Sequence, residues 1–274
     1  MKFTIAGGDS RNLTLGNILA QSGHSVEYMV PGEDIFSPVY TDYVIGPIPF
    51  TTDGENINAP LSKRAIKFKA FTDSIMSAKA LIAGKIPETV KKELEEKGIR
   101  TYDYLDREEM AILNSIPTAE GAISVAMQQL DVTLHGAKAL VIGYGRCGKT
   151  LAGKLKALNC DTYVLCRKKT DHAACEANGL YSISDSETTQ FLQKMDVIFN
   201  TAPALVLDRL RLAELKPGAV IIDIASLPGG CDDAYADEHG IKIIHALSLP
   251  GKVAPVTAAN ILYKVIEHII NERS

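Results

Sequence analysis

The chain has 274 residues, enough for two domains of ordinary size. Hydrophobic residues make up 46% of it and charged residues 23%, which is the balance of a globular protein and excludes a disordered one. The formal net charge of −4 gives no reason to expect binding to nucleic acid or to an anionic membrane surface.

The first residues form a short apolar segment that runs into glycines, without the longer apolar stretch of a signal peptide. No segment approaches the ~20 apolar residues of a membrane-spanning helix. The five cysteines form no CxxC pair, so we expect free thiols rather than a disulfide framework or a metal site. These features predict a cytoplasmic protein with neither a membrane segment nor a bound metal ion.

The N-terminal part of the chain alternates between strand-like and helix-like patterns. Strands are predicted at 3–7, 25–30, 42–45, 78–82 and 100–104. Helical spacing is present from Leu13 up to a stop at Gly23, in a mixed segment at 64–75 and in a charged segment at 87–97, whereas 47–60 has the composition of a loop. This alternation is typical of a parallel sheet with crossover helices.

A short helix is predicted at 106–113, with an interruption at Ser115-Ile116-Pro117. A long helix is predicted from Thr118 to Leu130, opened by Pro117-Thr118. Proline is tolerated at a helix start because its missing donor has no partner there. We interpret this long helix as the bridge between two domains.

The rest of the chain repeats the alternation. Strands are predicted at 136–143, 161–165, 196–200, 219–224 and 241–245, and helices after the first strand up to Leu158, at 171–177 and at 255–271. The last helix carries one wide apolar face, formed by Ala258, Ile261, Leu262, Val265, Ile266 and Ile269. Such a face must be buried, and packing back on the first domain would bury it.

The predicted fold is therefore α/β, with two Rossmann-like domains of parallel strands and a cleft between them. We expect a substrate or partner domain at 1–115, a bridging helix at 116–132, a dinucleotide-binding domain at 133–252 and the returning C-terminal helix at 253–274.

The strongest motif is Gly143-Tyr144-Gly145-Arg146-Cys147-Gly148, which matches GxGxxG. The pattern alone is weak, but here it follows an apolar strand and opens a helix, which is the context that gives it meaning. We expect Gly143 to allow a tight turn, Gly145 to let a pyrophosphate approach the backbone, and Gly148 to let helix and strand pack closely. The pyrophosphate would then lie at the helix N-terminus.

The next strand predicts which dinucleotide binds. An NAD site usually has an acidic residue there for the ribose 2′-hydroxyl, whereas this chain has Arg167-Lys168-Lys169. Arginine can hold a 2′-phosphate with two parallel hydrogen bonds, so we expect NADP(H), with Arg167 as the main contact and Lys168 as the second. The alternative is a solvated basic turn.

Three later loops follow predicted strands at the edge where open α/β sheets bind ligands, at 200–204, 223–230 and 245–256. We expect Thr201, Ala202 and Pro203 to contact the cofactor. Each loop taken singly is equally consistent with a structural turn.

Several motifs together resemble one family. They are Asn-Ser-Ile-Pro-Thr-Ala-Glu-Gly-Ala-Ile at 114–123, the glycine loop followed by Lys149, Asp-Ile-Ala-Ser-Leu-Pro-Gly-Gly at 223–230, Leu-Pro-Gly-Lys-Val-Ala-Pro-Val-Thr-Ala at 249–258, Gly-Gly-Asp-Ser-Arg at 7–11 and Pro-Phe-Thr-Thr-Asp-Gly at 49–54. In this order they resemble the family of dipicolinate synthase A subunits, over nearly the whole chain. The D-2-hydroxyacid and alanine dehydrogenases share only the glycine loop and the two-domain plan.

The resemblance implies an NADP-dependent oxidoreductase acting on a CH–CH group. The reaction is the oxidation of dihydrodipicolinate to dipicolinate (pyridine-2,6-dicarboxylate) in the mother-cell cytosol of a sporulating bacterium. The resemblance also implies that the partner is a flavoprotein-like second subunit, and we expect a homo-oligomer.

A dicarboxylate needs cations and backbone donors. We expect Arg11, Lys252 and the helix start at Pro117-Thr118 to supply them, the last through free N–H groups. Ser10, Thr51 and Asp53 are predicted to line the wall of the first domain. The alternative is that both cations are solvated and that the three loop residues make ordinary loop hydrogen bonds.

Candidate proton acceptors are His245, Glu120 and Asp223. A histidine or aspartate at a strand end also serves structural roles, and a glutamate in a first helical turn is favoured by the helix dipole alone. Two other functions stay open: a dehydrogenase for a 2-hydroxy or 2-amino acid, and a non-catalytic NADP-binding regulatory subunit whose partner carries the chemistry.

Overall fold

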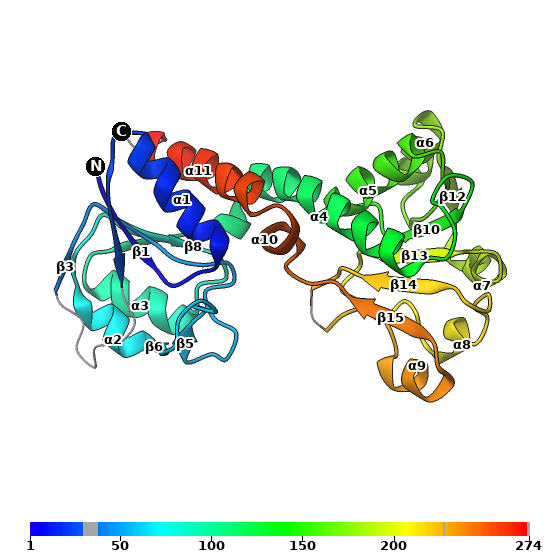
Figure 1. Ribbon diagram of the computed structural model, residues 1–274, viewed down its shortest axis with the longest axis horizontal. Helices are drawn as coiled ribbons and strands as arrows, with labels where there is room; N and C mark the ends of the chain where they lie inside the picture. Colours follow the sequence, from blue (N-terminus) through cyan, green and yellow to red (C-terminus); the bar gives the residue numbers. More distant parts are fainter. Residues whose placement is uncertain (30–37, 227, 273–274) are drawn as a thin grey trace. The chain divides into compact units, whose positions relative to one another are not determined.

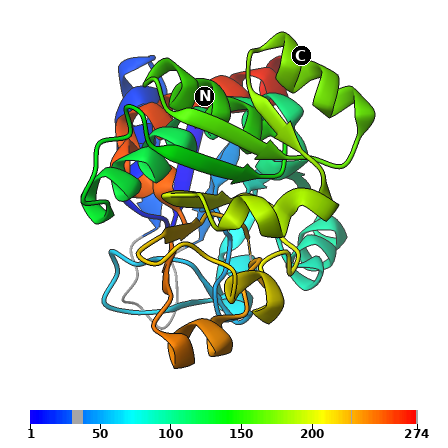
Figure 2. The ribbon, with the colours of Figure 1, turned by 90° about the vertical axis from the view of Figure 1, so that its right-hand side faces the viewer.

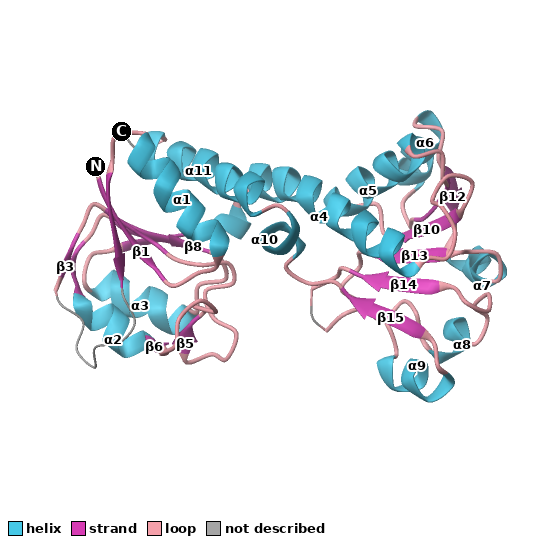
Figure 3. Ribbon diagram, in the orientation of Figure 1, coloured by secondary structure: helices cyan, strands magenta, loops and turns pink. Residues whose placement is uncertain are grey.

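The computed structural model describes residues 1–29, 38–226 and 228–272, and it divides into two compact units (Figures 1 and 3). Unit 1 comprises Met1–Leu113 with Ala254–Ser274, and unit 2 comprises Asn114–Val253. Each unit has its own parallel sheet and its own apolar core. The α/β class predicted from the alternating pattern is confirmed.

The sheet of unit 1 has the strand order β2-β1-β4-β8-β9, and all its pairs are parallel. Its strands are β1 Lys2–Ala6, β2 Ser25–Met29, β4 Tyr43–Ile45, β8 Ala80–Ala83 and β9 Arg100–Asp103. The predicted end of the second strand at Val30 lies outside the described residues. Burial on both faces explains why β8 is apolar throughout, since a parallel sheet is covered by helices on each side.

The helices that cover this sheet include α1 Ser10–Gln21, α2 Phe68–Ser74, α3 Glu88–Glu96 and α11 Pro255–Asn271. The predicted return of the last helix is confirmed, because Val265 and Ile266 of α11 are fully buried in one cluster with Phe3 of β1. Figure 1 shows α11 in red alongside α1 in blue. The opposite face packs against α2 and α3 through Phe71, Val90 and other apolar side chains.

Unit 1 also contains short strands that pair outside its main sheet. A small parallel pair joins β3 Val39–Tyr40 to β7 Ile75–Ser77, and an antiparallel pair joins β5 Asn56–Ile57 to β6 Ile66–Lys67. The predicted loop at 47–60 thus contains one strand of two residues and a cis peptide bond between Ile48 and Pro49.

The sheet of unit 2, which faces the viewer in Figure 2, has the order β12-β11-β10-β13-β14-β15, again all parallel. Its strands are β10 Lys138–Ile142, β11 Asp161–Leu165, β12 Tyr181–Ile183, β13 Val197–Asn200, β14 Val220–Asp223 and β15 Lys242–His245. Sequence reasoning missed β12, an edge strand of three residues in which only Ile183 is buried. So short a segment has no periodicity to detect.

The helices that begin in unit 2 are α5 Arg146–Ala157, α6 Lys169–Ala177, α7 Thr188–Leu192, α8 Arg209–Leu212, α9 Asp233–His239 and α10 Leu249–Val253. The first two correspond to predicted helices. The other four have at most seven residues and were not predicted. The segment before the last helix, interpreted as loop from its prolines and glycine, contains α10.

The predicted interruption before Pro117 is wrong. One helix, α4, runs from Glu108 to Gln129 with Pro117 inside it. Proline inside a helix loses one hydrogen bond and costs about 3 kcal/mol. Packing offsets that cost, because Ala119, Ala122 and Ala126 of α4 are fully buried in the core of unit 2.

Both sheets share one topological feature. In unit 1 the chain starts at β1, adds β2 on one side and then returns to add β4 on the other. In unit 2 the strands β10, β11 and β13 do the same. Open α/β sheets bind ligands outside the carboxyl ends of the strands where the order reverses, so each unit has one such edge to consider.

Candidate functional site

The glycine loop joins the carboxyl end of β10 to α5, and its first and last glycines are required by the chain itself. Gly143 has φ +94°, a conformation that L side chains rarely adopt. A Cβ atom on Gly148 would lie 2.1 Å from the carbonyl oxygen of Gly143. The predicted tight turn and the predicted close packing of helix on strand are both confirmed.

Gly145 differs from its two neighbours. A Cβ atom there would have nothing within 4 Å, and its φ of −80° is accessible to any residue. Gly145 is the N-cap of α5, no side chain of a described residue caps that helix, and no acidic residue lies in its first turn. The N–H groups at the start of α5 therefore form a cradle that fits a pyrophosphate, and the Arg146 side chain lies next to them in the sequence.

Two other residues of the loop have constrained side chains. Tyr144 is buried in the core of unit 2, with the Lys149 Nζ 5.3 Å from its ring centroid. Cys147 is partly buried, and burial raises the pKa of its thiol, so the thiol is neutral at ordinary pH. Neither side chain offers a charge to a ligand.

A basic turn follows β11. Leu165 and Cys166 are buried, whereas Arg167 and Lys168 are exposed, and Lys168 is the N-cap of α6. Within the part of the chain that the structure describes, neither cation forms an ion pair. The turn presents two uncompensated charges at the place where a carboxylate would select NAD.

The loop after β13 lies against the glycine loop. The Thr201 hydroxyl donates to the carbonyl of Ile142 at 2.8 Å, and a Cβ on Gly143 would be 2.8 Å from the same hydroxyl. The Ala202 N–H donates to Asn200 Oδ1 at 3.2 Å, and Pro203 is exposed. The predicted cofactor residues Thr201–Pro203 are thus held beside the turn that the cofactor would occupy.

Asn200, Asp223 and His245 occupy one register row across β13, β14 and β15. Asn200 Nδ2 donates to Asp223 Oδ1 at 2.9 Å. Sequence reasoning missed Asn200, which is fully buried. Its signal was a polar residue closing an apolar strand, the same signal that singled out Asp223.

Asp223 is almost wholly buried and its carboxylate is fully engaged. Besides Asn200, the N–H groups of Ala225 at 2.9 Å and Gly230 at 3.0 Å donate to it. Burial and then the charge of Asp223 raise the pKa of the nearby Cys231 thiol. These contacts support the structural alternative, in which Asp223 holds the loop at 224–230 (Leu227 lies outside the described residues).

His245 and Glu120 are the exposed members of the three predicted proton acceptors, whereas Asp223 is buried. Its side chain is 44% exposed, Nε2 lies 2.9 Å from Asp233 Oδ1, and Nδ1 lies 3.9 Å from Asp223 Oδ2. With the ring proton on Nε2 facing Asp233, the lone pair of Nδ1 accepts no hydrogen bond from a described residue. Asp233, which begins α9, orients the ring and was not singled out in the sequence.

The prediction that Glu120 falls in a first helical turn is wrong, because Glu120 lies in the middle of α4. It is exposed and pairs with Lys154 Nζ at 2.8 Å. For the same reason Pro117 and Thr118 open no helix, and the expected free N–H groups at that point are absent from the described chain. The Thr118 hydroxyl donates instead to the Asn114 carbonyl at 2.7 Å.

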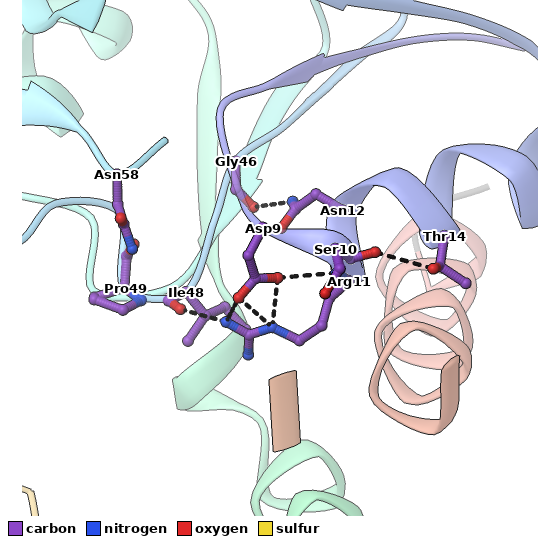
Figure 4. A network of polar contacts seen from close by, with 9 residues as sticks. All are labelled: Asp9, Ser10, Arg11, Asn12, Thr14, Gly46, Ile48, Pro49 and Asn58. Carbon is purple, nitrogen blue, oxygen red and sulfur yellow. Dashed lines mark hydrogen bonds and ion pairs between the residues drawn. The ribbon is translucent and has the colours of Figure 1, made fainter. Parts of the chain in front are cut away.

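The corresponding edge of unit 1 is organised around Arg11 (Figure 4). Asp9 is the N-cap of α1 and accepts from the Arg11 N–H at 2.9 Å. The Arg11 side chain is only 8% exposed, and its Nε and Nη2 donate to the Asp9 carboxylate. Nη2 also donates to the Ile48 carbonyl at 2.9 Å, and Figure 4 shows the remaining guanidinium nitrogen turned away from both partners.

Two opposing effects set the charge of this pair. Burial raises the pKa of Asp9, but the hydrogen bonds and the positive charge of Arg11 outweigh it, so the pKa lies below its usual value. Asp9 and Arg11 are therefore both charged at neutral pH and compensate each other. Ser10, between them, is partly buried, and its carbonyl accepts from Thr14.

Thr51 and Asp53 form a turn of their own. The Asp53 carboxylate accepts from the N–H groups of Glu55 and Asn56 at 2.9 and 2.8 Å, and the Thr51 hydroxyl accepts from Gly54 at 2.9 Å. Hydrogen bonds from Asn56 lower the pKa of Asp53. These contacts support ordinary loop bonding, and substrate contact by either residue stays a prediction.

Lys252 is exposed in α10 and belongs to unit 2, whereas Arg11 belongs to unit 1. Their joint role in binding one ligand stays a prediction. Within residues 1–29, 38–226 and 228–272, no helix is long and apolar enough to cross a membrane, and no cluster of His, Cys, Asp or Glu is arranged to hold a metal ion.

Comparison with known proteins separates the two parts of the chain. Residues 2–105 match the family model described as the N-terminal domain of the dipicolinate synthase A subunit. Residues 117–226 match that of the D-isomer specific 2-hydroxyacid dehydrogenase NAD binding domain. The A subunit of dipicolinate synthase from Bacillus subtilis (strain 168) is 31% identical, with 99% of this chain and 96% of that protein covered.

The chain belongs to the family of dipicolinate synthase A subunits. A crystal structure of a member from Bacillus halodurans superposes with a TM-score of 0.85 at 30% identity, covering 98% of this chain and 97% of that one. Apo D-lactate dehydrogenase from Escherichia coli, at 14% identity, a TM-score of 0.61 and coverage of 99% and 96%, shows the fold alone.

Membership of this family indicates the general class of the protein and of its cofactor. The dehydrogenase-type domain that contains the glycine loop makes the protein an oxidoreductase with a nicotinamide dinucleotide cofactor. Because the family forms one of the subunits of dipicolinate synthase, the protein has a partner subunit.

Proposed function

We propose that this protein oxidises dihydrodipicolinate to dipicolinate with NADP⁺ as the hydride acceptor. The reaction would take place in the mother-cell cytosol of a sporulating bacterium, with a flavoprotein-like second subunit. The observation that carries the proposal is the open N-terminus of α5 at Gly145, in a chain of this family.

The residues of unit 2 fit the cofactor. The N–H groups at the start of α5 would hold the pyrophosphate, and Arg146 would add a positive charge beside it. Arg167 and Lys168 would hold the 2′-phosphate, and 201–203 would lie along the ribose and nicotinamide end. When bound, the nicotinamide supplies a carbon atom, C4, that accepts a hydride.

The oxidation removes a hydride and one proton from the dihydropyridine ring. Bound NADP⁺ would take up the hydride, and His245 Nδ1 would accept the proton as the ring becomes aromatic. Asp233 holds the imidazole by its other nitrogen, 2.9 Å away, which keeps Nδ1 available. The gain of aromaticity favours the product, so a single weak base suffices.

The test is a turnover assay with the purified chain, NADP⁺ and freshly prepared dihydrodipicolinate. We expect dipicolinate and NADPH in equal amounts. His245→Gln should lower kcat by about 10²-fold or more, the usual contribution of a general base, with NADPH affinity unchanged. Absence of product from the chain alone, and from the chain with its partner subunit, would overturn the proposal.

One observation favours the non-catalytic alternative. Two of the three predicted proton acceptors are already engaged, Asp223 by N–H donors and Glu120 by Lys154. If the partner subunit carries the chemistry, the chain alone will bind NADPH without turnover, and His245→Gln will leave the rate of the two-subunit enzyme unchanged. Adding 2-hydroxy and 2-amino acids to the same assay tests the dehydrogenase alternative.

A further inference from the structure

Three residues other than glycine have a positive φ in the described chain: Lys85 (54°), Asn159 (56°) and Ser248 (58°). Asn159 directly follows the C-cap of α5, where asparagine is common in this conformation. Lys85 has no such explanation, because its side chain has no polar group near the backbone to stabilise a left-handed conformation. Backbone strain of this kind is concentrated at functional sites.

Lys85 lies two residues beyond β8, at the carboxyl edge of the unit 1 sheet. The Gly84 N–H donates to Pro47 at 3.0 Å, and the Phe50 N–H donates to Gly84. Arg11 donates to Ile48 in the same loop at 2.9 Å. The loop at 46–50 follows β4. It is therefore hydrogen-bonded to Arg11 on one side and to the Gly84-Lys85 turn on the other, so both lie at the same edge of the sheet.

The two lysines that flank β8 differ in their partners. Lys79, before the strand, pairs with Asp42 at 3.4 Å and lies over the Tyr43 ring. Lys85, after it, is exposed and has no hydrogen bond or ion pair through its ammonium group among the described residues. Asp9 compensates Arg11, whereas the Lys85 ammonium group has no ion-pair partner among the described residues; the Asp103 carboxylate lies beside the same turn, where it accepts from the Ile86 N–H at 3.1 Å.

We propose that Lys85 is a carboxylate-binding residue of unit 1, acting with Arg11 on the two carboxylates of a single ring. This assignment rests on the proposed function. β8 and β1 lie on either side of β4, so their ends are about 10 Å apart. The side chains of Arg11 and Lys85 are both long and cationic, so together they can reach one dicarboxylate across this distance. Neither the Asp9–Arg11 pair alone nor backbone donors alone would balance the two negative charges of such a ligand.

The test measures binding of pyridine-2,6-dicarboxylate and of pyridine-2-carboxylate by calorimetry in metal-free buffer. The variants are Lys85→Gly, Lys85→Arg and, as the matched control at the other end of β8, Lys79→Ala. NADPH affinity and melting temperature are measured for each, because they report folding and the cofactor site.

We expect Lys85→Gly to weaken binding of the dicarboxylate about tenfold or more and to remove the preference over the monocarboxylate. Its melting temperature should rise, since glycine adopts this φ without strain. Lys85→Arg should retain the preference, and Lys79→Ala should change neither affinity.

Unchanged discrimination in Lys85→Gly would overturn the assignment while leaving the proposed function intact. A lower melting temperature with equal loss of both anions would make Lys85 a structural residue and would also overturn it. If the unaltered protein binds NADPH but not the dicarboxylate, the proposed function fails and the assignment with it.

Discussion

The carboxyl edges of the two sheets have the same topology but differ in how the N-terminus of the first helix is capped. In unit 2 the helix after the central strand, α5, has Gly145 as its N-cap and no side-chain cap from the described residues. In unit 1 the equivalent helix, α1, has Asp9 as its N-cap, and the Asp9 carboxylate caps the helix and is itself held by Arg11. One N-terminus is open to an external anion, and the other is already occupied by an internal one.

This difference predicts that the two units suit different kinds of anionic ligand. An uncapped helix N-terminus suits a phosphate group, because N–H donors and the helix dipole both face it. A capped and compensated N-terminus does not, which is why we propose side-chain cations for a ligand of unit 1. On this proposal the shared fold sets where ligands bind, and the residues at the first turn set which ligands they are.

The largest effect is expected at the open N-terminus. Gly145→Val should lower NADPH affinity at least about 100-fold, or about 2.8 kcal/mol, because a branched side chain would stand where the pyrophosphate approaches. A Cβ atom on Gly153, in the same helix, would also have nothing within 4 Å, so Gly153→Val is the matched control. Both variants should unfold cooperatively. Normal NADPH binding by Gly145→Val would place the pyrophosphate elsewhere.

A smaller effect should distinguish the two cofactors. NADPH should bind at least about tenfold more tightly than NADH, a difference of about 1.4 kcal/mol, and Arg167→Ala should remove most of it. Arg209→Ala, an exposed arginine on α8, serves as control. Fluorescence titration of each protein with both cofactors measures the ratio. Equal affinities in the unaltered protein would contradict NADP selectivity.

Removing the carboxylate of Asp9 tests the role of the capped N-terminus of α1. Asp9→Ala should cost at least about 1 kcal/mol of unfolding free energy, the usual value of an N-cap, because it also leaves the buried Arg11 without its counter-charge. The folded-state pKa of Asp9 is lowered, so its contribution is present above about pH 4 and is lost as the pH falls through the folded pKa. Urea unfolding should therefore show the two proteins converging in acid. A difference that grows on acidification would contradict this account.

The smallest effect is expected from Glu120. Its ion pair with Lys154 is exposed, so Glu120→Gln should change the unfolding free energy by no more than about 0.5 kcal/mol. Turnover, whether measured with the chain alone or with its partner subunit, should be unchanged. A substantial fall in kcat with normal stability would restore Glu120 as a catalytic candidate.

The parts that could be predicted share a property: their signals are local. The glycine loop was recognisable because φ, close packing and helix start all lie within six residues, from Gly143 to Gly148. The last helix was predicted with the bounds it has, Pro255–Asn271, because its apolar face repeats over several turns. Segments without repetition, such as Tyr181–Ile183 and Leu249–Val253, were missed.

The α/β class, the glycine loop and the return of the C-terminal helix could be predicted from local patterns, because periodicity and steric demands act between near neighbours. The remaining features depend on tertiary packing. Burial of three alanines allows α4 to continue past Pro117. The register of β13, β14 and β15 places Asn200, Asp223 and His245 in one row. The loop at 46–50 ties Arg11 and the turn at Lys85 to one edge, although 74 positions separate them in the sequence (85 minus 11). Contacts between distant segments depend on the packing of whole elements, which no local pattern records.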